Sequence, residues 1–289
     1  MKGIVLAGGL GSRLYPITMG TCKQLVPIYD KPMIYYPLAT LMLAGIREIL
    51  LIATPEDIPK FYNLLRDGSH LGLSLTYKEQ SSPKGIAEAF IIGKAFIANQ
   101  PVALILGDNF FYGHKLQDIL QKSTKLSSGA QIFGYIVKDP SQYGVLAFDQ
   151  DNSLIDIIEK PLSPPSPYAV PGLYFYDGSV VDIAKSLRPS LRGELEITDI
   201  NKVYLKKEAL SAHLFDRGLT WLDTGTPKAL QQAASYVEAI QERQGTYIAC
   251  IEEIAYAQGF INHTQFQTLA HSLPNSPYGH YVKSIAQKP

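Results

Sequence analysis

A glycine-rich loop near the start of the chain carries groups that could hold phosphates. The apolar run Gly3–Leu6 leads into Ala7-Gly8-Gly9-Leu10-Gly11-Ser12-Arg13. Glycines let backbone N–H groups approach an anion closely, and the Arg13 guanidinium adds donors that match phosphate oxygens. Glycines are also typical of any tight turn from a strand to a helix, so the loop alone is weak evidence. Two other phosphate loops are excluded, because Leu14 occupies the third glycine position of G-x-G-x-x-G and the pattern G-x-x-x-x-G-K-[ST] is absent.

Two aspartates follow apolar segments at points where a ligand could bind. Asp108 lies just after the apolar run 102–106, so its carboxylate is expected at the carboxyl edge of a sheet, where open α/β folds bind ligands. Asp223 follows Trp221 and precedes a Thr-Gly-Thr sequence. Structural roles are also open for both: Asp108 could close a turn at the end of a strand, and Asp223 could cap a helix that begins near Pro227.

The elements that must position these residues alternate in the first part of the chain. Apolar runs predict strands at 3–6, 48–53, 74–77 and 102–106. Between them, apolar residues recur at three- and four-residue spacing and predict helices at 34–45, 55–65 and 84–98. Alternating strands and helices are typical of a parallel sheet with crossover helices, and strands that are apolar throughout are buried on both faces.

The pattern changes after Asp108. Short strands separated by turn residues are predicted at 130–137, 144–148, 154–159 and 169–176, and helices at 179–187, 197–206 and 227–243. The last of these helices is expected to begin after Thr226, a good N-cap followed by proline. Residues 161–167 hold four prolines and are expected to form a rigid loop, and residues 252–281 to form a small helical appendix. The fold class is therefore α/β: a Rossmann-like, mostly parallel central sheet flanked by helices, with a mixed-sheet insertion and a helical C-terminal part.

Composition excludes several classes of protein. The 289 residues include 26 Lys plus Arg and 26 Asp plus Glu, so no overall charge favours nucleic acid or a membrane surface. Cys22 and Cys250 lie far apart and lack the pattern of a disulfide framework or a zinc site. The longest mostly apolar stretch, 38–46, is less than half of the roughly 20 residues that cross a bilayer. We therefore expect a cytoplasmic protein with neither a nucleic-acid partner nor a membrane partner.

Several sequence blocks follow the glycine loop in a characteristic order. They include Arg13-Leu14-Tyr15-Pro16-Ile17-Thr18, Lys23-Gln24-Leu25-Val26-Pro27, Leu106-Gly107-Asp108-Asn109, Glu159-Lys160-Pro161, Arg192-Gly193-Glu194-Leu195-Glu196-Ile197-Thr198-Asp199 and Trp221-Leu222-Asp223-Thr224-Gly225-Thr226. Together they resemble the sugar nucleotidyltransferases, whose signature joins G-G-x-G-[TS]-R-L-x-P-x-T to K-x-L-x-P. The resemblance extends over essentially the whole chain.

This resemblance implies an activity. The chain would transfer the thymidylyl group of dTTP to α-D-glucose 1-phosphate with the help of Mg²⁺, giving dTDP-glucose and pyrophosphate for deoxysugar synthesis such as that of dTDP-rhamnose for polysaccharide. It would form one domain, 1–289, with a nucleotide-binding part (1–108), a sugar-phosphate-binding part (109–226) and a helical C-terminal part (227–289). A homotetramer is also implied.

The resemblance assigns site residues as well. The catalytic residues would be Arg13, Lys23, Asp108 and Lys160. The nucleotide would be bound by Leu6, Gly8, Gly9, Gly11, Ser12, Arg13, Gln24, Gln80, Pro83, Gly85 and Asp108. The sugar phosphate would be bound by Asn109, Tyr143, Gly144, Glu159, Lys160, Val170 and Arg192. One Mg²⁺ would be held by Asp108 and Asp223.

Some alternatives stay open at this stage. The Gln80 amide offers an acceptor and a donor that match the N3–H and O4 edge of thymine and of uracil alike, so a UTP- or CTP-preferring hexose-1-phosphate nucleotidyltransferase is a competing interpretation. A non-catalytic sugar-nucleotide-binding regulatory protein is another, because Lys84, Pro171 and Ala257 depart from the family pattern. Lys160 alone could also be a solvated surface charge paired with Glu159.

Overall fold

A large sheet organises the molecule. The computed structural model describes residues 1–9 and 11–287, so Leu10 of the glycine loop lies outside the described residues. The strand order is β10-β9-β11-β8-β12-β6-β1-β4-β5, with β13 paired to β8. Four neighbouring parallel strands form its core: β1 (Lys2–Leu6), β4 (Glu48–Ala53), β5 (Ser74–Glu79) and β6 (Val102–Leu106). The predicted parallel sheet is therefore confirmed.

The second half of the sheet is mixed. Its strands are β8 (Ala130–Ile136), β9 (Gly144–Phe148), β10 (Leu154–Glu159), β11 (Tyr168–Ala169), β12 (Leu173–Tyr176) and β13 (Leu210–Leu214). Because β12 pairs antiparallel with β6, the mixed strands continue the parallel core as one sheet. The insertion expected from the sequence thus shares its hydrogen-bonded framework with the nucleotide-binding part.

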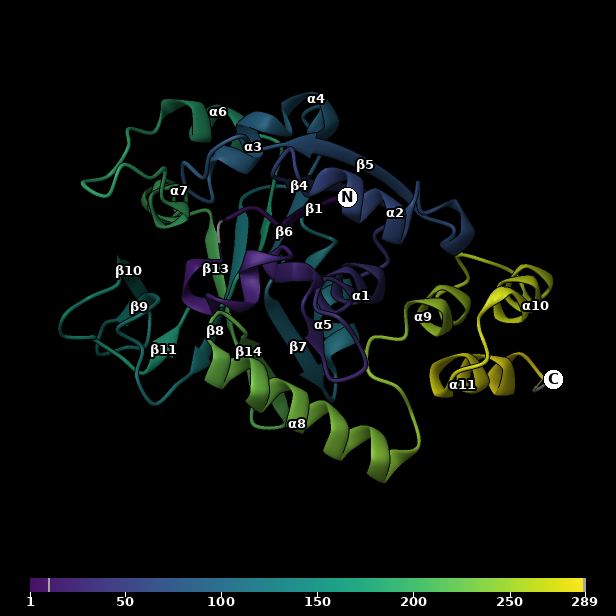
Figure 1. Cartoon of the computed structure of the whole chain (residues 1–289). Helices are drawn as coiled ribbons and strands as arrows, with labels where there is room; N and C mark the ends of the chain where they lie inside the picture. The colour runs from purple at the N-terminus through teal and green to yellow at the C-terminus, as the bar shows by residue number, and fades with distance from the viewer. Residues whose placement is uncertain (10, 288–289) are drawn as a thin grey trace.

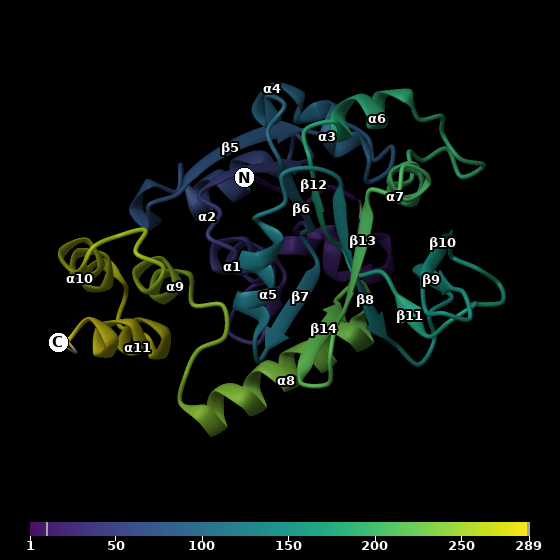
Figure 2. The ribbon, with the colours of Figure 1, turned by 180° about the vertical axis from the view of Figure 1, so that it is seen from behind.

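Helices cover both faces of the sheet (Figure 1, Figure 2). One face carries α1 (Tyr35–Leu43), α2 (Ile58–Leu65) and α5 (Leu116–Ser123), and the other carries α3 (Glu88–Ile92), α4 (Lys94–Ile97), α6 (Val180–Ser186) and α7 (Ile197–Lys206). Alternate residues of β1 join the two cores: Val5 packs with the first set and Ile4 with the second. This alternation explains why the strand is apolar at successive positions.

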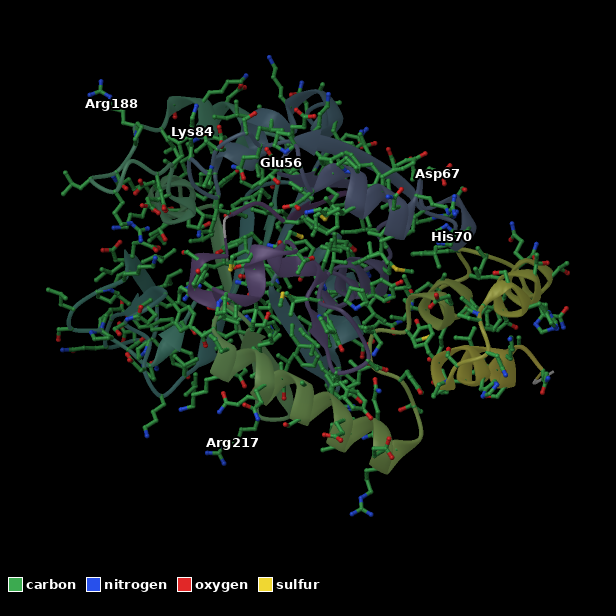
Figure 3. The ribbon with its side chains drawn as sticks, viewed as in Figure 1. Glu56, Asp67, His70, Lys84, Arg188 and Arg217 are labelled. Atoms are coloured by element: carbon green, nitrogen blue, oxygen red, sulfur yellow. The ribbon has the colours of Figure 1, made fainter. Side chains whose placement is uncertain are left out.

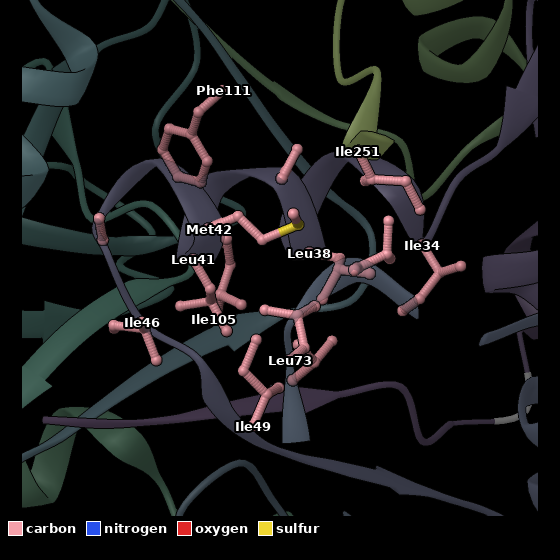
Figure 4. Close-up of a cluster of buried hydrophobic side chains, with 14 of the residues drawn as sticks. Ile34, Leu38, Leu41, Met42, Ile46, Ile49, Leu73, Ile105, Phe111 and Ile251 are labelled. Atoms are coloured by element: carbon pink, nitrogen blue, oxygen red, sulfur yellow. The ribbon is translucent and has the colours of Figure 1, made fainter. Parts of the chain in front are cut away.

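The C-terminal residues form helices, as predicted. The long helix α8 (Pro227–Gln244) begins at Thr226, whose side chain accepts a hydrogen bond from the Ala229 N–H at 3.2 Å. Three shorter helices follow: α9 (Ile251–Ala257), α10 (His263–Ser272) and α11 (Pro277–Ala286). They lie at the end of the molecule opposite β9 and β10 (Figure 1). Ile251, at the start of α9, packs beside α1 and belongs to the same hydrophobic core as Leu38 and Met42 (Figure 4).

Several short elements were not predicted. A two-stranded ribbon pairs β7 (Asn109–Gly113) with β14 (Leu219–Asp223), and a second pairs β2 (Pro27–Ile28) with β3 (Lys31–Pro32). Four 3-10 turns lie at Ser12–Leu14, Ile17–Met19, Lys23–Leu25 and Ser69–Leu71. The first ribbon matters for function, because its register sets Asp223 opposite Asn109.

Two predicted elements are corrected. The helix expected at 84–98 is divided at Gly93 into α3 and α4, and it begins only at Glu88. The start is late because the preceding segment bonds to the backbone of Leu195: Leu195 N donates to the Lys84 carbonyl, and Ala87 N donates to the Leu195 carbonyl. The strand expected at 169–176 is split into β11 and β12. Pro171 has no N–H for a strand ladder, and the N–H of Gly172 donates to the Asn109 side chain.

None of the described helices has the length and apolar character needed to cross a lipid bilayer. Cys22 and Cys250 are free thiols, and both are buried.

Candidate active site

The β7–β14 ribbon brings the two predicted aspartates together. Asp108 lies two residues beyond the end of β6, immediately before β7, and Asp223 is the last residue of β14. Thr224 stabilises the contact between the segments that carry the two aspartates, because its N–H and its Oγ1 both donate to the Asp108 carbonyl, at 3.1 and 2.7 Å. The alternative role of Asp223 as a helix cap is wrong, since Thr226 caps α8. Asp223 Oδ1 instead accepts a hydrogen bond from the Gly225 N–H at 3.0 Å.

The two carboxylates have opposite electrostatic environments. Burial would raise the pKa of Asp108, but the Lys23 ammonium bonded to Oδ2, together with the Asn109 amide 2.9 Å from Oδ1, holds that pKa below its usual value. Burial and the negative charge of Asp108 raise the pKa of Asp223, against the smaller opposing effects of Lys23 and Arg13. The Arg13 guanidinium lies 4.0 Å from Asp223 Oδ2. Asp223 is thus the carboxylate whose charge is poorly balanced.

A pocket opens on one side of this pair, between the β9–β10 edge and α7. All seven residues predicted to bind the sugar phosphate line it, with Arg13, Asp108 and Asp223: these seven are Asn109, Tyr143, Gly144, Glu159, Lys160, Val170 and Arg192. Glu159 is oriented by Thr198, whose Oγ1 donates to Oε2 at 2.6 Å. We call this cavity the sugar pocket.

A second pocket opens on the other side of Asp108. Most of the predicted nucleotide-binding residues line it: Leu6, Gly8, Gly9, Gln24, Gln80, Pro83, Gly85 and Asp108. A side chain at Gly8 would collide with Gln80 Oε1, and one at Gly85, where φ is +103°, would collide with the Leu195 carbonyl. Glycine at position 8 therefore leaves room for the Gln80 amide in the pocket, and glycine at position 85 permits the close approach to the Leu195 backbone. We call it the nucleotide pocket; it shares Ile86, Leu106, Asp108 and Glu194 with the sugar pocket.

Some predicted residues occupy other positions. Gly11, Ser12 and Lys23 line neither pocket. Gly11 precedes the first 3-10 turn in a left-handed conformation, and Lys23 is only 7% exposed, behind Asp108. Arg192 lines the sugar pocket, but its guanidinium is bound to Glu196 at 2.8 Å and lies 3.5 Å from Glu159.

Lys160 lies at the exposed rim of the sugar pocket, and its backbone N–H donates to the Tyr143 carbonyl at 2.9 Å. The ion pair between Lys160 and Glu159, considered from the sequence, is not formed: the partners of the Glu159 carboxylate are Thr198 and Arg192.

Several residues that line the sugar pocket were not predicted from the sequence: Ile86, Tyr174, Glu194, Thr198, Asn201 and Trp221. Thr198 and Asn201 lie three residues apart on one face of α7, and both are buried although polar. Thr198 belongs to one of the family blocks and Asn201 follows that block, so polar residues at helical spacing there are the signal that could have identified them. Trp221 donates its indole N–H to Asn109 Oδ1 at 2.6 Å.

The arrangement as a whole is that of an enzyme that joins two phosphate-bearing molecules. Residues 2–240 match the family model described as nucleotidyl transferase, and the chain belongs to this family. The resemblance seen in the sequence blocks is thereby confirmed.

Within the family, the chain is most informatively compared with glucose-1-phosphate thymidylyltransferases. The enzyme of that name from Xanthomonas campestris is 53% identical over 99% of this chain and 97% of its own length. The one from Neisseria gonorrhoeae is 52% identical over the full length of both chains.

Solved structures agree with the assignment to the nucleotidyl transferase family. A Bacillus anthracis protein, provisionally described as a glucose-1-phosphate thymidylyltransferase and solved with sucrose, is 41% identical and superimposes with a TM-score of 0.76 over 82% of this chain and 94% of its own. A UDP-glucose pyrophosphorylase in complex with UDP-glucose is 25% identical, with a TM-score of 0.71 over 84% and 99% of the two chains.

The departures from the family pattern lie in different surroundings. Lys84 is exposed at the surface near α3 (Figure 3), outside both pockets. Pro171 is buried between Val170 and Gly172, which both line the sugar pocket. Ala257 is the last residue of α9, in the C-terminal part of the chain, and lines neither pocket.

Proposed function

We propose that this chain transfers the thymidylyl group of dTTP to α-D-glucose 1-phosphate, releasing dTDP-glucose and pyrophosphate. One observation carries the proposal: a nucleotide pocket and a sugar pocket meet at Asp108, with cationic and acidic side chains at their junction. Two substrates bound in these pockets would present their phosphates to each other there. The names of the relatives at 50–53% identity support the same pair of substrates.

The reaction needs positioning and charge balance more than covalent catalysis. A phosphate oxygen of the sugar phosphate attacks the α-phosphorus of dTTP, a new P–O bond forms, and the bond to the β-phosphate breaks in line with it. Pyrophosphate leaves with the electron pair. In this proposal Arg13 stabilises the triphosphate and the departing pyrophosphate, and Lys160 binds the sugar phosphate. Lys23, which is buried and lines neither pocket, would have to turn from Asp108 to assist Arg13. Arg192 would have to exchange part of its contact with Glu196 for substrate.

The carboxylate pair fits a magnesium ion. Asp108 and Asp223 would supply oxygen ligands, and a bound cation would offset the burial and the Asp108 charge that raise the pKa of Asp223. Among residues 1–9 and 11–287 no group of three or more His, Cys, Asp or Glu side chains is placed to hold a metal, so phosphate oxygens and water would complete the ligand set. When bound, Mg²⁺ supplies charge stabilisation for the phosphate oxygens.

The orientation of Gln80 favours thymine or uracil over cytosine. Its Nε2 donates to Glu88 Oε2 at 2.7 Å, which leaves Oε1 directed toward Gly8 in the nucleotide pocket. An oxygen acceptor matches the N3–H of thymine and uracil, whereas cytosine has an acceptor at N3. UTP therefore stays the principal competing nucleotide, and the UDP-glucose complex of the more distant structural relative is a reason to test it.

The decisive test is pyrophosphate release with glucose 1-phosphate and Mg²⁺, run in parallel with dTTP, UTP, CTP, ATP and GTP. Fastest release with dTTP, and loss of release with a chelator, is expected. Fastest release with UTP would instead identify the chain as a uridylyltransferase. Calorimetric binding of dTTP without release under saturating conditions would instead support the non-catalytic alternative.

Three further assignments complete the proposal. Residues 1–108 serve the nucleotide, residues 109–226 the sugar phosphate, and residues 227–289 form the helical C-terminal part of one domain. The assembly is a homotetramer, which light scattering coupled to gel filtration would test. A cytoplasmic location is consistent with two free thiols.

A further inference from the structure

Two buried side-chain atoms lack a hydrogen-bond partner among the residues that the structure describes. They are Gln24 Oε1 and Asn201 Nδ2. Gln24 lines the nucleotide pocket, and Asn201 lines the sugar pocket. Buried polar groups are nearly always paired, so an unpaired donor and an unpaired acceptor, one in each pocket, indicate that a ligand completes them. Gln24 already belongs to the predicted nucleotide site, whereas Asn201 has no assigned role.

The orientation of the Asn201 side chain is set from the protein side. Tyr176, in β12, donates its hydroxyl to Asn201 Oδ1 at 2.5 Å. Tyr176 is fully buried and stacks on Tyr204, with ring centroids 5.6 Å apart, so this donor is held firmly. Asn201 itself is only 1% exposed. With Oδ1 occupied, Nδ2 is the polar group that the side chain has left to offer.

The neighbouring groups on the same wall are acceptors or are already engaged. Thr198, one turn earlier on α7, uses its hydroxyl proton on Glu159. Glu196 is bound by Arg192 and by Ser190. Glu159 can accept a hydrogen bond, and Asn201 can donate one. A sugar hydroxyl does both, because it donates its proton and accepts through its oxygen.

We propose that Asn201 is a specificity-determining residue, whose Nδ2 donates to one hydroxyl oxygen of the hexose in the sugar pocket. The inference rests on the proposed function, since it takes the hexose 1-phosphate as the occupant of that pocket. It adds that one hydroxyl of the sugar accepts a hydrogen bond from the Asn201 amide on α7, so a sugar that lacks this hydroxyl should bind less well. The competing explanation is a permanently bound water that satisfies Nδ2 and does not exchange for substrate.

Two variants test the inference. Asn201→Asp keeps an oxygen for the Tyr176 hydroxyl and replaces only the donor, and Asn201→Ala removes the amide. Lys202→Ala is the matched control on the same helix, because Lys202 forms a surface ion pair with Asp156 at 3.2 Å and does not line the sugar pocket. Melting curves report whether each variant is folded; should Asn201→Ala unfold, Asn201→Asp carries the test.

The measurement is kcat/KM for glucose 1-phosphate and for its 2-, 3-, 4- and 6-deoxy analogues. A loss of about three- to tenfold or more with glucose 1-phosphate is expected in both variants. With one deoxy analogue, wild type and variant should become equal, because the contacted hydroxyl is already missing. An equal loss with all five sugars would overturn the inference and favour the bound water.

Calorimetric binding of the same sugar phosphates separates this inference from the proposed function. In the first case, wild type releases no pyrophosphate, but Asn201→Asp binds every sugar phosphate except one deoxy analogue more weakly than wild type does. The proposed reaction then fails and the role of Asn201 stands. If pyrophosphate release is normal and no analogue equalises wild type and variant in either assay, the role of Asn201 fails alone.

Discussion

The Trp221 indole N–H donates to Asn109 Oδ1 at 2.6 Å, across the β7–β14 ribbon. The Gly172 N–H donates to the same oxygen at 3.0 Å, and the Asn109 amide in turn donates to Asp108 Oδ1 at 2.9 Å. Asn109 was predicted to bind the sugar phosphate; its side chain lines the sugar pocket, is buried, and forms hydrogen bonds within the protein at both ends of its amide. Its bonds in the structure hold the carboxylate of Asp108 in place, and Trp221 fixes the direction of its amide.

Trp221→Phe is expected to lower kcat by about three- to tenfold, because it removes one hydrogen bond from the group that orients Asp108. Tyr135→Phe is the control, since the Tyr135 ring packs against Trp221 and would be kept. Steady-state kinetics on both variants is the measurement. An unchanged kcat in Trp221→Phe, with the protein folded, would show that Asn109 holds its orientation without the indole.

Asp108→Asn and Asp223→Asn should each lower kcat about a hundredfold or more, because charge stabilisation by a bound metal is worth several kcal/mol. Their melting temperatures should differ in direction. Asp108→Asn leaves the buried Lys23 ammonium without its partner and should destabilise the fold. Asp223→Asn removes a carboxylate whose pKa is raised by burial and by Asp108, and should not destabilise it.

Kinetics and thermal melting on the same preparations check this pair. Asp182→Asn, at an exposed ion pair with Lys185 3.0 Å away, should match wild type in both. Near-wild-type turnover in both site variants would refute the metal assignment.

Gly8→Ala should raise the KM for the nucleotide about tenfold or more with a smaller effect on kcat, because the new methyl group must displace the Gln80 amide from the nucleotide pocket. Gly20→Ala is a suitable control, since a Cβ there meets nothing within 4 Å and φ is −106°. Initial rates at varied nucleotide concentration are required. Equal KM values in wild type and Gly8→Ala would argue against contact between Gln80 and the base.

Glu252→Gln should remove the part of the pH dependence of folding stability that is caused by the buried Glu252 carboxyl in the C-terminal part. Burial raises the pKa of Glu252 above its usual 4.5, although Tyr278 donates a hydrogen bond to it. Between that value and the raised pKa, the folded chain binds more protons than the unfolded chain, so stability falls as pH rises through this interval. The variant should therefore melt higher than wild type at neutral pH, and the difference should shrink below about pH 4.5.

Thermal melting from pH 4 to 8 measures this difference. Glu238→Gln, at an exposed position on α8, is the control for the loss of one carboxylate elsewhere in the C-terminal part. If the difference in melting temperature between wild type and Glu252→Gln is the same at every pH, the assignment of the raised pKa to Glu252 is contradicted.

Much of the fold was predictable because it depends on local patterns. Continuous apolar runs at β1, β4 and β6 report strands buried on both faces, and Thr226 followed by proline reports the start of α8. Predictions failed where hydrogen bonds to a distant backbone segment replaced the local helical ones. The backbone of Leu195 bonds to the Lys84 carbonyl and to the Ala87 N–H, so α3 begins later than predicted.

The sequence by itself determined which residues could do chemistry: the glycine loop, the two aspartates, the cations, and their order along the chain. Only the tertiary structure decided how they are held. Trp221 and Asn109 are 112 residues apart. The Asn201 side chain is oriented, with Nδ2 toward the sugar pocket, by the hydroxyl of a tyrosine 25 residues away in β12. Hydrogen bonds between such distant groups depend on how the strands pair and how α7 packs on the sheet, and side-chain periodicity carries information only about which face of an element is buried.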